Sequence, residues 1–178
     1  MVTSAFPRSA IHFVVGLSLL GPANGIAAPK ENTTVSVTAT MSFIDPIVIT
    51  ENNPLQFGVL SVAMAANDSI TIGTDDSLGG STQLIINGNQ AAADLTVTSG
   101  STASITIAVS AIVNGAGYNL HDFMCAYNSG PPTACDGIGF NVTSVASAPL
   151  KIGATLTGNG SDSVGLAYGS FDVTINYQ

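Results

Sequence analysis

The sequence has little charge and few aromatic residues. Only 8% of its 178 residues are charged, aromatic residues make up 6%, and Trp is absent. A soluble domain usually has about a quarter of its residues charged. The low charge does not indicate disorder, because 46% of the residues are hydrophobic. The shortage of aromatic residues counts against a carbohydrate-binding platform, which usually presents aromatic faces.

Basic residues are also scarce. Three Lys and Arg residues stand against 11 Asp and Glu, and the net charge is −8 at pH 7. Without a basic patch to meet phosphate groups, the protein is not expected to bind nucleic acid. The same deficit argues against docking on an anionic membrane surface.

One apolar run stands near the N-terminus. The stretch "FVVGLSLLGPANGIAA" follows Arg8 and ends in small residues. This pattern is typical of a secretory signal peptide, and we expect residues 1–27 to be removed by cleavage after Ala27. A membrane anchor is the alternative, but the run is shorter than the ~20 apolar residues of a span and contains Pro22 and Asn24.

The remainder, residues 28–178, is long enough for one domain with its own core. No segment after the signal is apolar enough to predict a membrane span. We therefore expect an exported protein.

Two cysteines fit an exported protein. Cys125 and Cys135 flank the turn-rich stretch "AYNSGPPTA". In an oxidising compartment this spacing predicts a local disulfide, with a stabilisation of about 2–3 kcal/mol. A metal or redox pair is the alternative, but there is no Cys-x-x-Cys spacing, and His121 is the only histidine after the signal.

Strand patterns fill the rest of the chain. Short alternating or β-branched runs are separated by Gly, Asn, Asp and Pro clusters, with "ENNP" (51–54) read as a turn and "TDDSLGGS" (74–81) as a loop. The fold expected from this pattern is all-β: an antiparallel immunoglobulin-like β-sandwich of about nine to eleven short strands, with a closed barrel as the alternative. Strands are expected at 33–43, 47–50, 55–62, 68–73, 83–88, 93–100, 103–110, 121–128, 137–146, 150–158 and 169–178.

The chain ends on one of these strands. Apolar and polar residues alternate to the last residue, which most domains would leave frayed. A terminal strand that ends flush can pair with another chain along its whole length. Its apolar face consists of Phe171, Val173, Ile175 and Tyr177.

The expected strand at 33–43 lies close to the new N-terminus and stops before Asp45-Pro46. Two interpretations remain open. The segment is either the first strand of the protein's own sandwich or a donor strand that fills a groove in a neighbouring subunit. In the second case Asp45-Pro46 acts as a hinge, because proline lacks an N–H donor and restricts the preceding residue. The candidate strand-donation face consists of Val35, Val37, Ala39, Met41 and Phe43.

No catalytic or metal-binding set is evident. His121 and Asp122 are adjacent, but there is no Gly-x-Ser-x-Gly nucleophile elbow. Asp75, Asp76 and Ser77 form an acidic loop of the kind that calcium prefers, yet the ligand frame of a calcium loop is missing. We therefore predict no enzyme activity, no metal and no cofactor.

Four stretches, in this order, carry a family resemblance: "TTVSVTATM", "PLQFG" (54–58), "LTVTSGSTASITIAV" (95–109) and "GSFDVTINY" (169–177). Together they resemble domain of unknown function 4402, a family of bacterial secreted β-rich proteins. The layout is also similar to spore coat protein U-like domains, which include subunits of archaic chaperone–usher pili. The resemblance implies a bacterial protein located in the periplasm, on the cell surface or outside the cell. It also implies a periplasmic chaperone and an usher as partners, with the chaperone bound at the last strand. Pilin-type domains usually carry a Cys shortly before the Leu-x-Phe-Gly element, where this chain has Asp45-Pro46.

The sequence thus favours a non-enzymatic structural protein, a subunit of a surface fibre, pilus or coat that forms homo-oligomers by β-strand addition. A monomeric secreted binding module, for carbohydrate or another surface ligand, is the first alternative. A hydrolase is the second alternative, and it lacks a recognisable catalytic set.

Overall fold

The computed structural model describes residues 38, 40–41, 45–60, 64–115, 117–160 and 169–178. Two compact units are distinguished, Met1–Thr40 and Met41–Gln178, and the strands found in the described residues lie in the second. The expected signal peptide, residues 1–27, lies outside the described residues.

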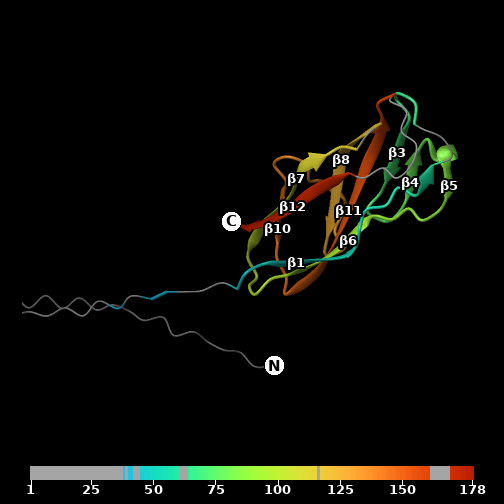
Figure 1. Cartoon of the computed structure of the whole chain (residues 1–178). Coiled ribbons are helices and arrows are strands. Elements are labelled where there is room, and N and C mark those ends of the chain that lie inside the picture. The colour runs from blue at the N-terminus through green and yellow to red at the C-terminus, as the bar shows by residue number, and fades with distance from the viewer. Residues whose placement is uncertain (1–37, 39, 42–44, 61–63, 116, 161–168) are drawn as a thin grey trace, which may run out of the picture. The chain divides into compact units, whose positions relative to one another are not determined.

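The described part of the second unit is all-β, with its strands paired in antiparallel sheets, as the sequence predicted (Figure 1). One 3₁₀ turn, Thr82–Leu84, is the helical element found there. The strands are β1 (Val48–Asn53), β2 (Val59–Leu60), β3 (Ser69–Ile72), β4 (Leu78–Gly80), β5 (Ile85–Asn87), β6 (Ala93–Thr98), β7 (Ser104–Val113), β8 (Tyr118–Tyr127), β9 (Thr133–Ala134), β10 (Phe140–Thr143), β11 (Ser147–Gly158) and β12 (Ser170–Tyr177).

The larger sheet is organised around β11, its longest strand. On one side the first half of β11 pairs with β6 and its second half with β3, while β8 runs along its other side. β1 extends the sheet beyond β6, β4 extends it beyond β3, and β9 adds a short edge beside β8. A close approach at Gly153 makes the change of partner possible, because a Cβ there would lie 2.2 Å from the carbonyl oxygen of Ile72.

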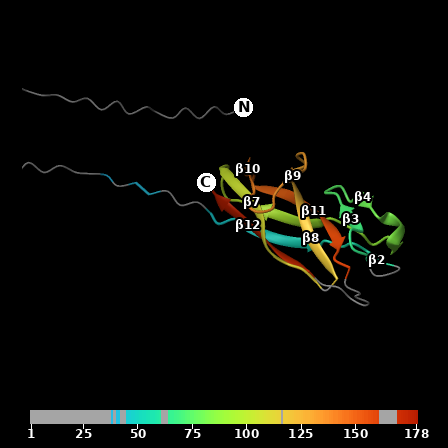
Figure 2. The same cartoon turned by 90° about the horizontal axis from the view of Figure 1, so that it is seen from above.

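The smaller sheet has three strands in the order β10-β7-β12, and a separate two-stranded ribbon joins β2 to β5. Figure 2, which views the molecule from above, shows β7, β10 and β12 on one side of β8 and β11. β7 pairs along most of its length with β12, from Ser170 opposite Val113 to Tyr177 opposite Ile105.

The core lies between these two sheets. Alternation places Ile105, Ile107 and Val109 of β7 on an inward face that is fully buried. They belong to one apolar cluster with residues of β6, β8 and β11, including Phe123 and Ile152. The antiparallel sandwich expected from the sequence is therefore confirmed, with side chains of both sheets sharing one core.

Several local expectations were wrong. The predicted turn at 51–54 is mostly strand, because residues 51–53 continue β1 and pair with β6 across an irregularity. Of the predicted strand at 55–62, the structure describes residues 55–60, which form an isolated bridge from Gln56 to Ala91 and the two residues of β2. Gly58 between them has φ +83°, which interrupts an extended strand.

Two further corrections concern 74–88. The predicted loop at 74–81 contains β4, which pairs with β3 in a hairpin. The predicted strand at 83–88 begins with the 3₁₀ turn, and only Ile85–Asn87 are extended. In both cases the pairing partner, rather than local composition, decides the conformation.

Candidate functional site

The edge of the smaller sheet formed by β12 is the first element of the site. Its side chains alternate strictly between exposed and half-buried, so one face points to the core and the other to solvent. Among the described residues β12 pairs with β7 alone, which leaves its second edge without a ladder partner there. The half-buried residues are the four predicted from the sequence, Phe171, Val173, Ile175 and Tyr177.

The edge of the larger sheet formed by β1 is the second element. In the described part of the chain, β1 pairs with β6 alone. Ile49 packs on the core, and so do Ile47 before the strand and Leu55 after it. Two apolar sheet edges, one from each layer, therefore border the same core.

Contacts at the two ends show how these edges run. At one end the hydroxyl of Tyr177, at the close of β12, donates to the carbonyl of Asp45, just before β1. At the other end a groove of about 260 Å³ is lined from both strands. The edges thus run in opposite directions with the groove between them; its lining consists of Glu51, Pro54, Leu55, Ala93, Leu95, Gly169, Ser170, Phe171 and Val173.

Two nearly buried apolar side chains lie at the floor of this groove. Ala93 and Leu95 of β6 are 4% and 7% exposed. Glu51 lies opposite Leu95 in the β1–β6 ladder and places an exposed carboxylate at the groove's rim. An extended segment with alternating apolar residues is the kind of ligand that fits an apolar floor beside a free strand edge.

A hydrogen-bonded seat joins the end of β12 to the segment before β1, at the end of the two strands opposite the groove. The Tyr177 hydroxyl lies 2.8 Å from Ser99 Oγ and 3.1 Å from the carbonyl oxygen of Asp45. Ser99 is buried and also bonds the carbonyl oxygen of Ser101 at 2.8 Å. Gly100 leaves room for Asp45, because a Cβ on Gly100 would lie 2.1 Å from the Cβ of Asp45. We call Asp45, Ser99, Gly100 and Tyr177 the Asp45 seat.

The candidate strand-donation face lies largely outside the described residues. Val35, Val37, Ala39 and Phe43 belong to the part of the chain that the structure does not describe. Met41 is described, belongs to no strand and is 79% exposed.

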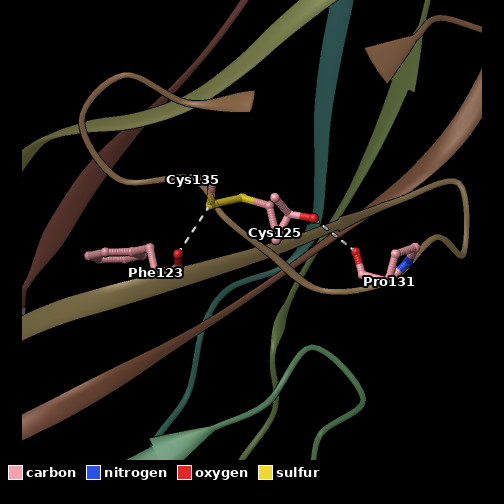
Figure 3. Close-up of a disulfide and its surroundings, with 5 residues drawn as sticks. Phe123, Cys125, Pro131 and Cys135 are labelled. Atoms are coloured by element: carbon pink, nitrogen blue, oxygen red, sulfur yellow. Dashed lines mark hydrogen bonds between the residues drawn. A yellow bond between two sulfur atoms is a disulfide. The ribbon is translucent and has the colours of Figure 1, made fainter. Parts of the chain in front are cut away.

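Cys125 and Cys135 form the disulfide expected from their spacing, with Cα atoms 5.8 Å apart (Figure 3). Both residues are fully buried, and Cys135 Sγ lies 3.6 Å from the carbonyl oxygen of Phe123. The disulfide ties the segment after β9 onto β8. The backbone of Cys135 bonds Phe123 on β8 and Val109 on β7, so this segment bridges the two sheets.

A second hollow, of about 630 Å³, lies beside the turn between β3 and β4. Ser77 donates from both its hydroxyl and its backbone N–H to Asp75 Oδ1, at 2.5 and 3.2 Å. These two hydrogen bonds lower the pKa of the Asp75 carboxyl, the hydroxyl bond contributing most. Lys151 also lines the hollow, and its ammonium is paired with Asp94 at 3.0 Å.

His121 and Asp122 make a more specific contact than the sequence indicated. His121 Nδ1 lies 2.9 Å from Asp122, and its Nε2 lies 2.7 Å from the hydroxyl of Thr157. The order carboxylate–imidazole–hydroxyl is that of a catalytic triad. However, Thr157 lies within β11, which is paired on both sides, so nearby N–H groups are directed into the ladders rather than toward an oxyanion. This placement supports a structural role.

Within the described residues, no group of three or more His, Cys, Asp or Glu side chains could hold a metal ion. The same part of the chain contains no helix long and apolar enough to cross a bilayer.

Residues 47–177 match the family described as domain of unknown function DUF4402. The chain belongs to this family. The match spans all the strands of the described unit, and the family description assigns no activity. No curated protein and no solved structure matches the chain. The predicted similarity to spore coat protein U-like domains and pilus subunits stays a prediction.

Sequence reasoning missed part of this site. It did not find β1 as the opposing edge, and it did not connect Tyr177 with Ser99 and Asp45. The only sequence signal for that connection is that Tyr177 stands at the end of an apolar face, where a Tyr can bury its ring and keep its hydroxyl bonded.

Proposed function

We propose that this member of the DUF4402 family is an exported, non-enzymatic structural subunit of a bacterial surface fibre, pilus or coat, and that it assembles by β-strand addition. The observation that carries the proposal is the groove between β1 and β12. There an apolar core is bordered by two strand edges, each paired on one side only among the described residues. Unpaired edges are where chains associate.

The occupant that we propose is the segment 33–43 of another copy. Its five alternating apolar residues match the alternation of β12, whose inward face has four. An added strand would satisfy the free N–H and C=O groups of β12 and cover the half-buried side chains. A periplasmic chaperone and an usher are the partners proposed for export and assembly, with the chaperone occupying the same groove beforehand.

Export is supported by two features. The disulfide between Cys125 and Cys135 suits an oxidising compartment. The apolar run within residues 1–27 suits a cleaved signal. The low basic content is compatible with a surface protein that binds neither nucleic acid nor anionic lipid.

A matched pair of substitutions tests the proposal. Val37→Asp places a charge on the face meant for burial, whereas Thr38→Asp places the same charge one residue away on the opposite face. We expect the exported wild-type chain and Thr38→Asp to form oligomers and Val37→Asp to remain monomeric with an intact fold. Light scattering after size-exclusion chromatography and negative-stain microscopy give the readout. A wild-type chain that stays monomeric at high concentration would contradict the proposal.

A secreted binding module is the second candidate, and the hollow beside Asp75 favours it. Its lining combines carboxylate, hydroxyl and ammonium groups from Asp75, Ser77 and Lys151 with the apolar side chains of Met124 and Ala126. Polyhydroxylated ligands pair with such a combination. Binding of the monomeric wild-type chain to a bacterial polysaccharide, lost in Asp75→Asn, would favour this candidate over the fibre subunit.

A further inference from the structure

The Asp45 seat fixes the point at which the N-terminal segment joins the sandwich. The backbone of Asp45 is held by the Tyr177 hydroxyl, and its side chain lies against Gly100. Ser99, which is 4% exposed and directly follows β6, lies with its Oγ 2.8 Å from the same hydroxyl. The chain therefore enters the domain beside the C-terminal end of β12 (Figure 1), whereas the groove lies at the N-terminal end of this strand.

This position creates a competition for the groove. A strand attached to the same chain has an effective concentration of about millimolar, well above that of a neighbouring subunit in dilute solution. If the segment 33–43 could reverse freely, it would fill its own groove and no assembly would follow. A fibre subunit therefore needs a physical barrier to self-filling.

The seat and the residues beside it supply this barrier. To enter its own groove, the chain would have to reverse direction between Phe43 and Ile47. Tight reversals between antiparallel strands favour Gly, Asn or Asp at positive φ, and Asp45 is the only such residue in the intervening stretch. However, Asp45 precedes Pro46, which restricts it to extended conformations and offers no N–H donor.

We propose that the Asp45 seat prevents the segment 33–43 from filling its own groove and so commits it to a second copy of the protein. This inference rests on the proposed function, since it concerns the same groove and the same occupant. It assigns Tyr177, Ser99 and Gly100 as positioning residues that decide between intramolecular and intermolecular strand addition. The family match assigns no role to these residues.

An insertion tests the inference directly. Eight Gly and Ser residues placed between Ile44 and Asp45 reach about 15 Å, which exceeds the ~10 Å between packed sheets. The matched control carries the same insertion between Asn32 and Thr33, where it leaves the seat and the reversal unchanged. Both are compared with the wild-type exported chain and with a chain lacking residues 28–43.

We expect the wild-type chain and the control to form oligomers. The variant with the insertion at Ile44 should be monomeric and should melt at a higher temperature than the chain lacking residues 28–43, because its groove is filled. Tyr177→Phe keeps the ring and removes the hydroxyl. It should raise the monomer fraction by about two- to tenfold, which corresponds to the net free energy of one hydrogen bond. Tyr127→Phe, which removes a hydroxyl bonded to Val145 N instead, should leave that fraction unchanged.

The outcomes separate this inference from the proposed function. If the Ile44 insertion variant assembles as well as the wild type, the seat is not the barrier, although strand addition stands. If the wild-type chain is monomeric and loses stability when residues 28–43 are removed, it already fills its own groove, and the seat inference is wrong. If all forms are monomeric and melt alike, strand addition itself fails.

Discussion

The rings of Phe123 and Phe171 lie with their centroids 4.9 Å apart and their planes inclined by 58°. Phe123 belongs to β8 of the larger sheet, and Phe171 belongs to β12 at the edge of the smaller one. This pair therefore joins the two layers next to the groove. Aromatic contacts of this tilted kind add about 0.5–1.5 kcal/mol to the burial of the rings.

We expect unequal effects when either ring is truncated. Phe123 is fully buried, so Phe123→Ala should lower the free energy of unfolding by about 3–5 kcal/mol. Phe171 is only half-buried, so Phe171→Ala should cost less than Phe123→Ala in the monomeric protein. Urea denaturation measures both losses, and equal losses would show that β12 is covered more completely than the structure indicates.

The disulfide should contribute measurable stability. Its loop closes over a separation of ten residues, and replacing both Cys125 and Cys135 with Ala should lower the free energy of unfolding by about 2–3 kcal/mol. Peptide mapping without reductant should recover the two residues in one cross-linked fragment. Two free thiols in protein taken from the periplasm or the medium would contradict this expectation.

Glycine at 153 should be required by close backbone packing. A Cβ there would lie 2.2 Å from the carbonyl oxygen of Ile72 and 3.0 Å from the backbone nitrogen of Thr74. Gly153→Ala should therefore destabilise the protein by about 1–3 kcal/mol. Gly79→Ala is the matched control, because its nearest neighbour would be an ordinary contact at 3.7 Å. Thermal melts of both variants measure this difference in stability, and equal melting temperatures would reject the packing argument.

Acid should weaken the contact between Asp75 and Ser77. The hydrogen bonds from the hydroxyl and the backbone of Ser77 lower the pKa of the Asp75 carboxyl, so they favour the charged form. The stability that they contribute is present above the carboxyl's ordinary pKa and is lost as pH falls through its folded pKa.

The destabilisation caused by Ser77→Ala should accordingly shrink as the solution is acidified through that range. Ser110→Ala, at an exposed position on β7, serves as the control. Carboxyl chemical shifts followed by NMR should show the pKa of Asp75 rising toward its ordinary value in Ser77→Ala. An unchanged titration would contradict the cause that we assign.

Export should leave Ala28 as the N-terminal residue. The small residues before this point and the apolar run before them predict cleavage after Ala27. Intact-mass spectrometry of the secreted protein identifies the N-terminal residue. A mass that retains residues 1–27 would show that this segment is not a cleaved signal.

The predictable parts of the fold are those in which one strand face alternates strictly. Ser69–Ile72 and Ser170–Tyr177 were found from the sequence because every second side chain is apolar, whatever the partner strand is. Residues 51–53 were misassigned because Asn and Pro nearby indicate a turn, whereas β6 offers a ladder that overrides this preference. β4 was missed because a three-residue strand with two glycines has no pattern of its own.

The sequence by itself determined the all-β class, the exposed and buried faces of β12, and the pairing of Cys125 with Cys135. These depend on side-chain periodicity, which acts over neighbouring residues, and on the presence of exactly two cysteines. Only the tertiary structure decided that β1 stands opposite β12 and that Tyr177 meets Ser99 and Asp45, which are 78 and 132 positions away. Such contacts follow from how the two sheets pack, and packing depends on the whole core at once rather than on any local pattern.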